Sequence, residues 1–320
     1  MQIFRSLSEV PAALGPTVAT IGNFDGVHRG HQKVIHEVIA RAHHLDTSSL
    51  AITFDPHPAR ILHPESRRPL ITPLHQKLEL LSETGLNATL VLPFNEELSH
   101  TTARDFAQTT LRGRLKVVEL HEGDNFRFGY RAEAGVESLD ALGHELGFRV
   151  VIDSPQILRG APVSSTRIRQ LIAAGDVSGA RALLGRPFEI VSRPSPGRGY
   201  GTRYTVPTIN LAPYDELIPA IGVYITALTV AGECFQAVTN VGNRPTFGED
   251  SFTIESHILN FHPIDLDDKT SLHLAFLKRL RDEVQWPSPE ALREQIGRDV
   301  RRAQRYFSLC GRRTSEEHSL

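Results

Sequence analysis

Short apolar runs alternate with amphipathic segments through the first half of the chain. The apolar runs predict buried strands at residues 17–21, 50–54, 88–93, 115–120 and 149–152. The segments between them predict helices from about Gln32 and around residues 74–81, 102–111 and 135–146. Because strands and helices alternate at this spacing, we predict βαβ units and a parallel sheet.

The pattern then changes to short strands. A helical stretch from Ser165 to about Gly185, with a break at Gly175, separates the two halves. Beyond it, strands separated by glycine and proline are expected at residues 188–191, 205–211, 223–230, 234–241, 252–261 and 272–277, and they predict a small antiparallel barrel. A final helix is predicted from Ser288, with Pro289 at its first position. Its apolar stripe consists of Leu292, Ile296, Val300, Ala303 and Phe307.

The change of pattern predicts two domains. We expect the first over residues 1–185 and the second over residues 186–310, followed by a polar, disordered tail over 311–320. A chain of 320 residues is long enough for each domain to bury its own core.

Composition and charge narrow the class of protein. The net charge of −2 gives no basic field, so we expect no nucleic acid as a partner. No run approaches the roughly 20 apolar residues needed to span a bilayer, so we expect no membrane as a partner. Cys234 and Cys310 have no metal-ligand spacing and are expected to be reduced thiols. A cytoplasmic enzyme is the default expectation, and the oligomeric state is not indicated.

A glycine-rich turn follows the first buried strand and leads into the first predicted helix. It contains Gly22, Gly26 and Gly30, with His28 and His31 where the turn becomes the helix. Helix N-termini favour anions, glycines allow a phosphate to approach the main chain, and imidazoles donate hydrogen bonds to phosphate oxygens. No Gly-x-x-x-x-Gly-Lys motif followed by Ser or Thr occurs in the chain. The turn therefore predicts nucleotide chemistry without a P-loop lysine.

Three further polar segments follow strands of the predicted sheet. They are residues 54–58 with His57, residues 123–129 with Asn125, and residues 164–169 with Ser164, Thr166 and Arg169. Each could be an ordinary turn or helix cap, and for His57 a structural turn position is about equally plausible. Because the carboxyl ends of parallel strands meet at one sheet edge, we expect these segments to surround one ligand.

The barrel half contains a second set of polar positions. A loop with Gly197, Gly199 and Gly201 leads into a strand with Thr208 and Asn210, which are two residues apart and share one face. Hydroxyl and amide oxygens can hold Mg²⁺ beside ATP phosphates. Glu255 lies inside another strand, and its residues alone favour a solvated strand face.

Almost the whole chain resembles the bifunctional riboflavin kinase/FAD synthetases of bacteria. The matching motifs are residues 22–31, Asp-Pro-His-Pro at 55–58, Phe-Arg-Phe-Gly at 126–129, the run 164–169, Pro-Thr-Ile-Asn at 207–210, residues 240–247 and Glu-Ser-His at 255–257. The resemblance implies a Rossmann-like nucleotidyltransferase domain, which transfers AMP from ATP to FMN and gives FAD and pyrophosphate. It also implies a barrel domain that phosphorylates riboflavin. ATP would be the co-substrate, Mg²⁺ the metal, and riboflavin, FMN and FAD the flavin ligands.

The resemblance also assigns roles to single residues of the first domain. His28 and His31 would bind the ATP phosphates during catalysis. Nucleotide-binding roles fall to Asn23, Phe24, Asp25 and Gly30, and to Ser164, Thr166 and Arg169 on the triphosphate. His57 and Asn125 would contact the flavin substrate, with Asn125 at a position where an aspartate is expected in many relatives.

For the second domain, the resemblance makes Glu255 the general base for the ribityl 5′-hydroxyl. Thr208 and Asn210 would bind Mg²⁺ and ATP. The ATP loop would contain Gly197, Gly199, Gly201 and Pro207, and the flavin side Arg244 and Phe247. Thr205 stands where relatives usually have a glycine, so the loop cannot adopt a positive φ cheaply there.

Three functions are compatible with these observations. The first is a two-step enzyme that makes FMN and then FAD. The second keeps only the adenylyltransferase, with a barrel that binds flavin. The third is a non-catalytic flavin-binding or regulatory protein. The presence of His28, His31, Asn210 and Glu255 favours the two-step enzyme.

Overall fold

The computed structural model describes residues 1–320 except 67, 196–207, 245–250, 260–265, 268 and 318–320. The described chain divides into two compact units, Met1–Ser165 and Thr166–Leu320. The predicted domain boundary at residue 185 lies where the pattern changes from helices to strands. The division into compact units instead falls after Ser165, so it places the helices that follow Ser165 in the same unit as the barrel. No helix in the described ranges is long and apolar enough to span a bilayer.

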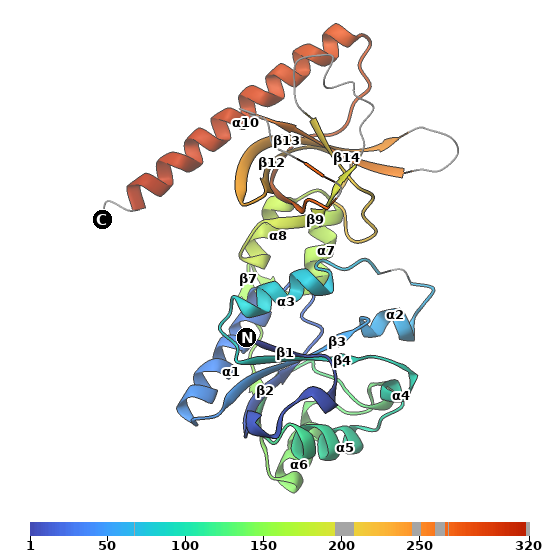
Figure 1. Ribbon diagram of the computed structural model, residues 1–320, viewed down its shortest axis with the longest axis vertical. Helices are drawn as coiled ribbons and strands as arrows, with labels where there is room; N and C mark the ends of the chain where they lie inside the picture. Colours follow the sequence, from blue (N-terminus) through green and yellow to red (C-terminus); the bar gives the residue numbers. More distant parts are fainter. Residues whose placement is uncertain (67, 196–207, 245–250, 260–265, 268, 318–320) are drawn as a thin grey trace. The chain divides into compact units, whose positions relative to one another are not determined.

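The first unit is built on a parallel six-stranded sheet in the order β1-β4-β3-β2-β5-β6 (Figure 1). The strands are β1 (Gln2–Phe4), β2 (Thr17–Ile21), β3 (Ser48–Asp55), β4 (Ala88–Pro93), β5 (Val117–Gly123) and β6 (Arg149–Asp153). Every neighbouring pair is parallel, which confirms the predicted sheet. The carboxyl ends of β2, β3 and β5 therefore meet at one edge.

Helices cover both faces of this sheet. They are α1 (Arg29–His44), α2 (Pro58–Leu62), α3 (Leu74–Ser82), α4 (Glu96–Ser99), α5 (Ala103–Asp105), a π-helical segment η3 (Phe106–Arg114) and α6 (Val136–Leu146). Short 3₁₀ turns are η1 (Leu7–Glu9), η2 (Ala12–Leu14) and η4 (Tyr130–Ala132), and a small hairpin is formed by β7 (Ile157–Leu158) and β8 (Ala161–Pro162). One buried cluster packs α1 against the sheet through Val18, Ile35 and Val38. Another packs η3 and α6 through Leu111, Phe106 and Leu139.

The second unit begins with the helix pair α7 (Ser165–Ala173) and α8 (Val177–Leu184), which are separated at Gly175 as the sequence predicts. Its sheet has the order β10-β11-β14-β13-β12-β15-β9. The strands are β9 (Phe188–Ser192), β10 (Pro194–Ser195), β11 (Thr208–Leu211), β12 (Gly222–Val230), β13 (Glu233–Arg244), β14 (Ser251–Ile258) and β15 (Leu272–Arg281). Every pair is antiparallel.

This sheet curls into a half-barrel. Strands β9 and β10 lie at its opposite edges, although only Arg193 separates them in the chain. The edges can meet this closely only if the sheet bends round on itself. The hydroxyl of Ser192, at the end of β9, donates to the carbonyl of Ala212, which follows β11, at 3.2 Å and links β9 to the other side of the sheet. The predicted antiparallel barrel is confirmed in this form.

The last helix, α10 (Pro289–Glu317), is longer than the sequence predicts. It continues past Gly311, where we expected a disordered tail, because a single glycine costs only about 1 kcal/mol in a helix. Asp299 of α10 is 2% exposed at its side chain and pairs with Arg281 of β15 at 2.9 Å. Leu292 and Ile296 are 42% and 40% exposed, so the first part of the predicted stripe is not packed like Ala303, which is fully buried.

A buried ionic network lies on β5. Glu119 and His121 are 2% and 3% exposed, and they share one strand face because they are two residues apart. Glu119 accepts two hydrogen bonds from Arg41 of α1, at 2.8 and 2.9 Å. One ring nitrogen of His121 lies 2.9 Å from Glu119, and the other lies 3.2 Å from Asp153. The hydrogen bond from Arg41 is the largest influence on the pKa of Glu119, which falls to about 2. Burial alone would lower the pKa of His121, but the two carboxylates raise it above its ordinary value.

We predict that the first unit loses stability as the pH rises through the pKa of His121. Because this pKa is higher in the folded than in the unfolded chain, the stabilisation is complete below about pH 6.5 and is lost above the folded value. The loss should be about 1.5–3 kcal/mol, the range for hydrogen bonds to charged groups. Urea unfolding between about pH 6 and pH 9, followed by circular dichroism, measures it.

Two controls accompany this measurement. The fluorescence of Trp286, the single tryptophan, marks unfolding of the second unit. The variant His121→Asn should lose the pH dependence, and an unchanged slope in that variant would contradict the role of His121.

Candidate active sites

A turn over residues 22–28 connects β2 to α1 at the carboxyl edge of the sheet. His28 is the N-cap of α1, and its Nδ1 accepts a hydrogen bond from the backbone N–H of His31 at 3.3 Å. The rings of His28 and His31 are stacked, with centroids 3.6 Å apart and 14° between their planes. Because the His28 side chain provides the cap, α1 begins at Arg29 rather than near Gln32. The two predicted histidines are therefore brought together at a helix N-terminus.

The imidazoles of His28 and His31 are held in defined states. His28 is 4% exposed, and since its Nδ1 accepts a hydrogen bond, the proton of its neutral form is on Nε2. Burial, then the charges of His28 and Lys77, lower the pKa of His31 well below its ordinary value. His31 is therefore neutral near pH 7. Its Nδ1 is buried and has no hydrogen-bond partner among the described residues.

The turn has a strained backbone that buried hydrogen bonds maintain. Phe24 and Val27 have φ values of 47° and 37°, in the left-handed region that non-glycine residues rarely adopt. The carboxylate of Asp25, which is 3% exposed, accepts hydrogen bonds from the backbone N–H groups of Ile71 and Thr72, both at 3.0 Å. The Phe24 ring packs in the core beside α1. The side chains of Phe24 and Asp25 thus hold the turn in place, and their predicted contact with a nucleotide stays a prediction.

Gly30 lets the two histidine rings lie close to the helix. A Cβ atom at this position would lie 3.2 Å from the Cε1 and Nδ1 atoms of the His28 ring and 3.5 Å from the carbonyl oxygen of Val163. The two separations from the His28 ring are tighter than most real Cβ contacts, whereas the one from Val163 is ordinary contact. The predicted importance of Gly30 therefore has a steric basis in the packing of His28.

An aromatic cavity of about 880 Å³ opens beside the turn, with Gly22 and Asn23 in its wall. Its other walls come mainly from the ends of β3 and β4 and from the loop after β5. Aromatic side chains in these walls are Phe54, Phe94, Phe106, Phe126, Phe128 and Tyr130. Rings at this density suit a large, planar, aromatic ligand.

The predicted flavin-side residues have different surroundings. Asn125 lines the aromatic cavity, as its predicted role requires. His57 is the N-cap of α2, and its Nδ1 accepts a hydrogen bond from the backbone N–H of Ala59 at 3.1 Å. The neighbouring Pro58 lines the cavity. His57 therefore has a structural role, while its contact with substrate stays a prediction.

The predicted phosphate segment 164–169 is divided between the two units. Ser165 donates a hydrogen bond to the backbone carbonyl of Asp25 at 2.9 Å, which connects the start of α7 to the 22–28 turn. Ser164 belongs to the first unit, and Thr166 and Arg169 lie on α7 in the second unit. That Ser164, Thr166 and Arg169 act together with the histidines stays a prediction.

Sequence reasoning missed two buried charged residues beside the turn. Lys77 of α3 is 6% exposed and donates to the Asn23 carbonyl and to Thr53 Oγ1, both at 3.1 Å. Glu122 of β5 is 3% exposed and accepts a hydrogen bond from the backbone N–H of Ile21 at 2.6 Å. Burial raises the pKa of Glu122 well above its ordinary value, and the charge of Asp153 adds to this. No motif marks either residue, because nothing in a single sequence shows that these positions are buried.

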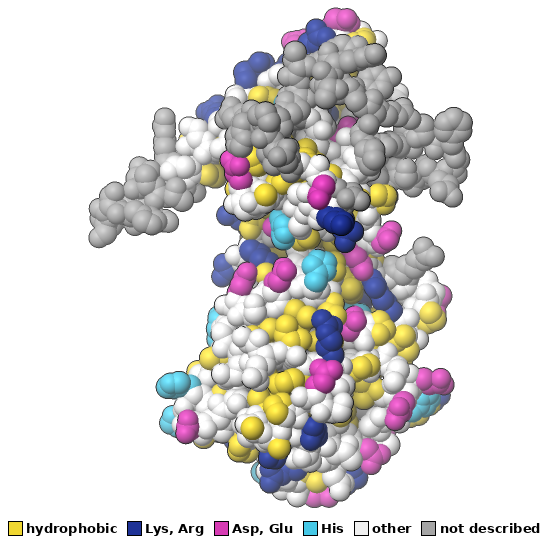
Figure 2. Space-filling model, in the orientation of Figure 1, with side chains coloured by type: hydrophobic (Ala, Val, Ile, Leu, Met, Phe, Trp, Pro, Cys, Tyr) yellow, Lys and Arg dark blue, Asp and Glu magenta, His cyan; other side chains and the backbone are white. Residues whose placement is uncertain are grey.

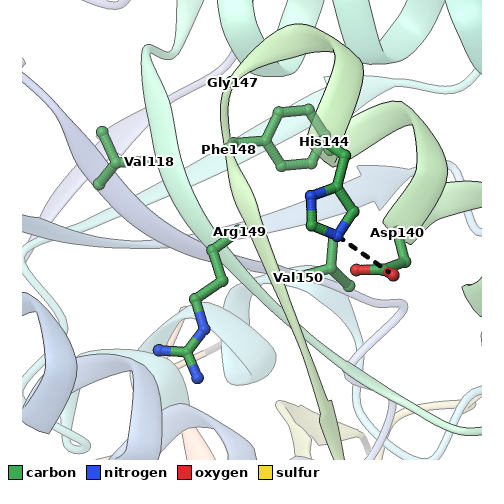
Figure 3. Close-up of a pocket in the computed structure, with 8 residues that line it drawn as sticks. Val118, Asp140, His144, Gly147, Phe148, Arg149 and Val150 are labelled. Carbon is green, nitrogen blue, oxygen red and sulfur yellow. Dashed lines mark ion pairs between the residues drawn. The ribbon is translucent and has the colours of Figure 1, made fainter.

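A smaller pocket of about 420 Å³ lies at the amino end of β6 (Figure 3). In it, His144 of α6 is turned toward Asp140, at 3.7 Å, and their side chains are 84% and 50% exposed. Arg149 also lines the pocket. Because the strands are parallel, this pocket is at the opposite sheet edge from the 22–28 turn. It therefore does not belong to the site around the histidines.

In the second unit, strand register brings the predicted kinase residues together. Asn210 on β11 opposes Glu255 on β14, and Glu255 opposes Asn240 on β13. Directly opposed residues of antiparallel strands point to the same side, so these three side chains form one row. Thr208 lies two residues from Asn210 on the same face and opposes His257. Burial lowers the pKa of His257, which is therefore neutral near pH 7.

This row has the oxygen atoms that a hard cation requires. Asn210 Oδ1 is buried and has no hydrogen-bond partner among the described residues. Asn240 donates to Glu283 at 3.2 Å, so a second carboxylate, which the sequence did not indicate, lies beside the row. A Cβ at Gly242 would lie 2.6 Å from Glu283 Oε1, so a larger residue there would make this exposed carboxylate shift. Oxygen ligands of this kind fit Mg²⁺.

Several predicted kinase residues lie outside the described residues. These are the loop residues Gly197, Gly199, Gly201 and Pro207, and the flavin-side residue Phe247. Arg244 is the last residue of β13, and the structure describes its backbone alone. The roles of these residues stay predictions.

Figure 2 shows acidic and basic side chains interspersed over the visible face of each unit, which agrees with the net charge of −2. Hydrophobic side chains gather in patches between them on the face of the first unit. Neither sign of charge dominates the coloured part of this face.

Comparison with known proteins gives two domain matches. Residues 10–167 match the family model described as FAD synthetase, and residues 184–307 match the family model described as riboflavin kinase. A bifunctional riboflavin kinase/FMN adenylyltransferase of Pseudomonas fluorescens is 35% identical over 94% of this chain and 96% of its own length. The protein of that name from Escherichia coli K12 is 32% identical over 95% of this chain and 96% of its own length.

A solved structure has a similar fold over nearly the whole chain. It is a crystal structure described as a macrolide-efflux protein from Streptococcus pneumoniae. It has a TM-score of 0.86 and 24% identity, and covers 94% of this chain and 98% of that chain. At this identity the likeness shows a shared fold and nothing about activity.

We predict that Gly30→Ala impairs the histidine site without destabilising α1. Alanine is favoured over glycine in a helix by up to about 1 kcal/mol, which offsets the loss of the His28 cap, so thermal stability should change little. The added methyl group should displace the His28 ring, which is held by its cap and by stacking on His31. FAD formation from FMN and ATP should fall by about tenfold or more. Unchanged FAD formation would contradict the steric role of Gly30.

Proposed function

The chain belongs to the family of bifunctional riboflavin kinase/FMN adenylyltransferases, and we propose that each of its two activities depends on the residues described above. The N-terminal domain is an FAD synthetase, which transfers AMP from ATP to FMN and releases pyrophosphate. The C-terminal domain is a riboflavin kinase, which phosphorylates riboflavin to FMN. What we propose concerns the residues, the metal and the location.

For adenylylation, the observation that carries the proposal is the shared turn. Gly22 and Asn23 form part of the wall of the aromatic cavity, and the same turn leads directly to His28 and His31. The isoalloxazine ring of FMN would occupy the cavity, and the ATP phosphates would lie at the start of α1. The FMN phosphate would then meet the α-phosphate of ATP over the turn.

The chemistry of this step needs no strong base. An oxygen of the FMN phosphate attacks the α-phosphorus, a new P–O bond forms, and the bond to the bridging oxygen of pyrophosphate breaks. His28 Nε2–H and the helix N-terminus would donate to the phosphates as charge develops on the leaving group. Asn125 would orient the substrate from the cavity wall.

For phosphorylation of riboflavin, Glu255 would accept the proton of the ribityl 5′-hydroxyl as the hydroxyl oxygen attacks the γ-phosphorus of ATP. The new P–O bond forms as the bond to the bridging oxygen breaks and ADP leaves. Mg²⁺ would neutralise charge on the ATP phosphates when it is bound. The Asn210 amide oxygen and the Thr208 hydroxyl would hold it, and the unpartnered, buried Oδ1 of Asn210 supports this assignment. Asn240, in register with Glu255, would keep the row of Asn210, Glu255 and Asn240 in place through its hydrogen bond to Glu283.

We also infer that the enzyme works in the cytoplasm. Cys234 and Cys310 are both free, exposed thiols, which fits a reducing compartment. The proposal includes the predicted functional boundary at residue 185, which would assign Thr166 and Arg169 of α7 to adenylylation. The partners of the enzyme are the small-molecule substrates riboflavin, FMN and ATP.

We predict that Glu255→Gln blocks FMN formation and spares FAD formation. Glutamine keeps the size of the side chain but cannot accept the hydroxyl proton, so the kinase rate should fall by about 10²–10⁴-fold. FMN and FAD are measured by chromatography after incubation with riboflavin, or with FMN, in the presence of ATP and Mg²⁺. Equal loss of both activities in a folded variant would contradict two separate sites.

The matched variants His28→Ala and His31→Ala should have the reverse effect. Each removes an imidazole at the phosphate end of the turn, so FAD formation from supplied FMN should fall by about 10²-fold or more. Riboflavin phosphorylation in the same proteins is the control and should be retained. If FAD formation is unchanged, the two histidines do not bind the ATP phosphates.

A further inference from the structure

We propose that Lys77 is a positioning residue for FMN adenylylation, which holds the 22–28 turn from α3 and sets the electrostatic environment of His31. The inference rests on the function proposed for the first unit. It concerns a residue that does not line the aromatic cavity and is not part of the motifs of the turn.

The burial of Lys77 is the first observation. Lysine is almost never buried unless its charge is satisfied, and Lys77 is 6% exposed. Its ammonium donates to the Asn23 carbonyl and to Thr53 Oγ1, both at 3.1 Å. Thr53, which is fully buried, donates to the same carbonyl at 3.3 Å. Two donors thus converge on one backbone oxygen of the turn.

The position of that oxygen is the second observation. Asn23 directly precedes Phe24, whose left-handed φ costs about 1–3 kcal/mol and persists only where the surroundings hold it. A second anchor of the turn comes from Thr72, just before α3, and this side chain is neutral. Its Oγ1 accepts a hydrogen bond from the Gly26 N–H at 2.9 Å, and its own N–H donates to the Asp25 carboxylate. The hydrogen bonds from Lys77 and Thr53 to the Asn23 carbonyl therefore fix the start of the turn. Among the contacts described, Lys77 brings the only charge from α3 to this carbonyl.

The charges around His31 are the third observation. His28 stacks on His31, and Phe24, which follows the Asn23 that Lys77 binds, lies edge-on to His31 with ring centroids 5.2 Å apart. Burial is the largest influence, and the charges of His28 and Lys77 lower the pKa of His31 further. Two carboxylates, Asp25 and Asp55, act on Lys77 and favour its charged form against the effect of burial on its pKa. A charged Lys77 therefore disfavours protonation of His31 and keeps it a neutral donor to phosphate.

Two variants separate these two roles in the full-length protein. Lys77→Gln removes the charge but can still donate to the Asn23 carbonyl. Thr53→Val keeps the charge and removes one of the two donors to that carbonyl. For each, kcat/KM for ATP in FAD formation is measured from about pH 5 to pH 9 with FMN and Mg²⁺. Riboflavin phosphorylation by the same protein serves as the internal control.

In Lys77→Gln, His31 should accept a proton more easily, so the acidic limb of the pH profile should move up by about half a pH unit or more. In Thr53→Val, kcat/KM should fall several-fold at all pH values while the limb stays in place. Lys77→Arg, which keeps the charge, should leave the limb near its wild-type position.

Three results would overturn the inference. The first is an acidic limb that does not move in Lys77→Gln. The second is the same shift of the acidic limb in Thr53→Val. The third is an equal loss of FAD formation and riboflavin phosphorylation in Lys77→Gln, which would make Lys77 only structural. If the wild-type protein itself forms no FAD, the proposed function fails, and the inference fails with it. Those results are distinguishable because the wild-type assay is read first.

Discussion

The adenylylation site depends on one constraint, the strained turn between β2 and α1. The chain must leave a buried strand and enter a helix within seven residues, and Phe24 and Val27 adopt left-handed conformations to do so. The buried carboxylate of Asp25 keeps this path by accepting hydrogen bonds from Ile71 and Thr72. The turn then places His28 as the cap of α1 and Asn23 in the wall of the aromatic cavity. The proposed phosphate and flavin sites thus share one short segment.

The kinase site depends on a different kind of constraint, which is strand register. Asn210, Glu255 and Asn240 come from three strands, and only the pairing of β11 with β14 and of β14 with β13 aligns them. A slip by one residue would turn Glu255 to the other side of the sheet. Fully buried hydroxyl groups of Thr226, Thr239 and Ser256 are linked at 2.7 and 2.8 Å across β12, β13 and β14. They tie these strands together next to the row.

Much of this architecture could be predicted from the sequence. Apolar runs predicted β2 and β4 with the bounds that the structure has, because strands buried on both faces have mostly apolar positions. The three-residue β1 was missed because so short an edge strand has no periodic signal. Helix α10 extends to Glu317, which composition alone does not indicate, and the disorder expected of the tail stays a prediction.

The candidate sites were predictable in membership but less so in role. The glycine turn and its companion segments indicated a site at the sheet edge, because strand ends of a parallel sheet must meet there. The sequence could not show that Phe24 and Asp25 face the fold, since a motif does not distinguish a ligand contact from a buried hydrogen bond. Lys77 and Glu122 were missed because their burial depends on how α3 and β5 pack, and Glu283 because it approaches Asn240 across the sheet.

The central claim is that one chain makes FMN at one site and converts it to FAD at another. The most direct measurement is incubation of the purified protein with riboflavin, ATP and Mg²⁺, followed by separation of the flavins by chromatography over time. The account predicts that FMN appears first and that FAD then forms from it with release of pyrophosphate. Riboflavin that remains unphosphorylated, or FMN that accumulates without any FAD, would contradict it.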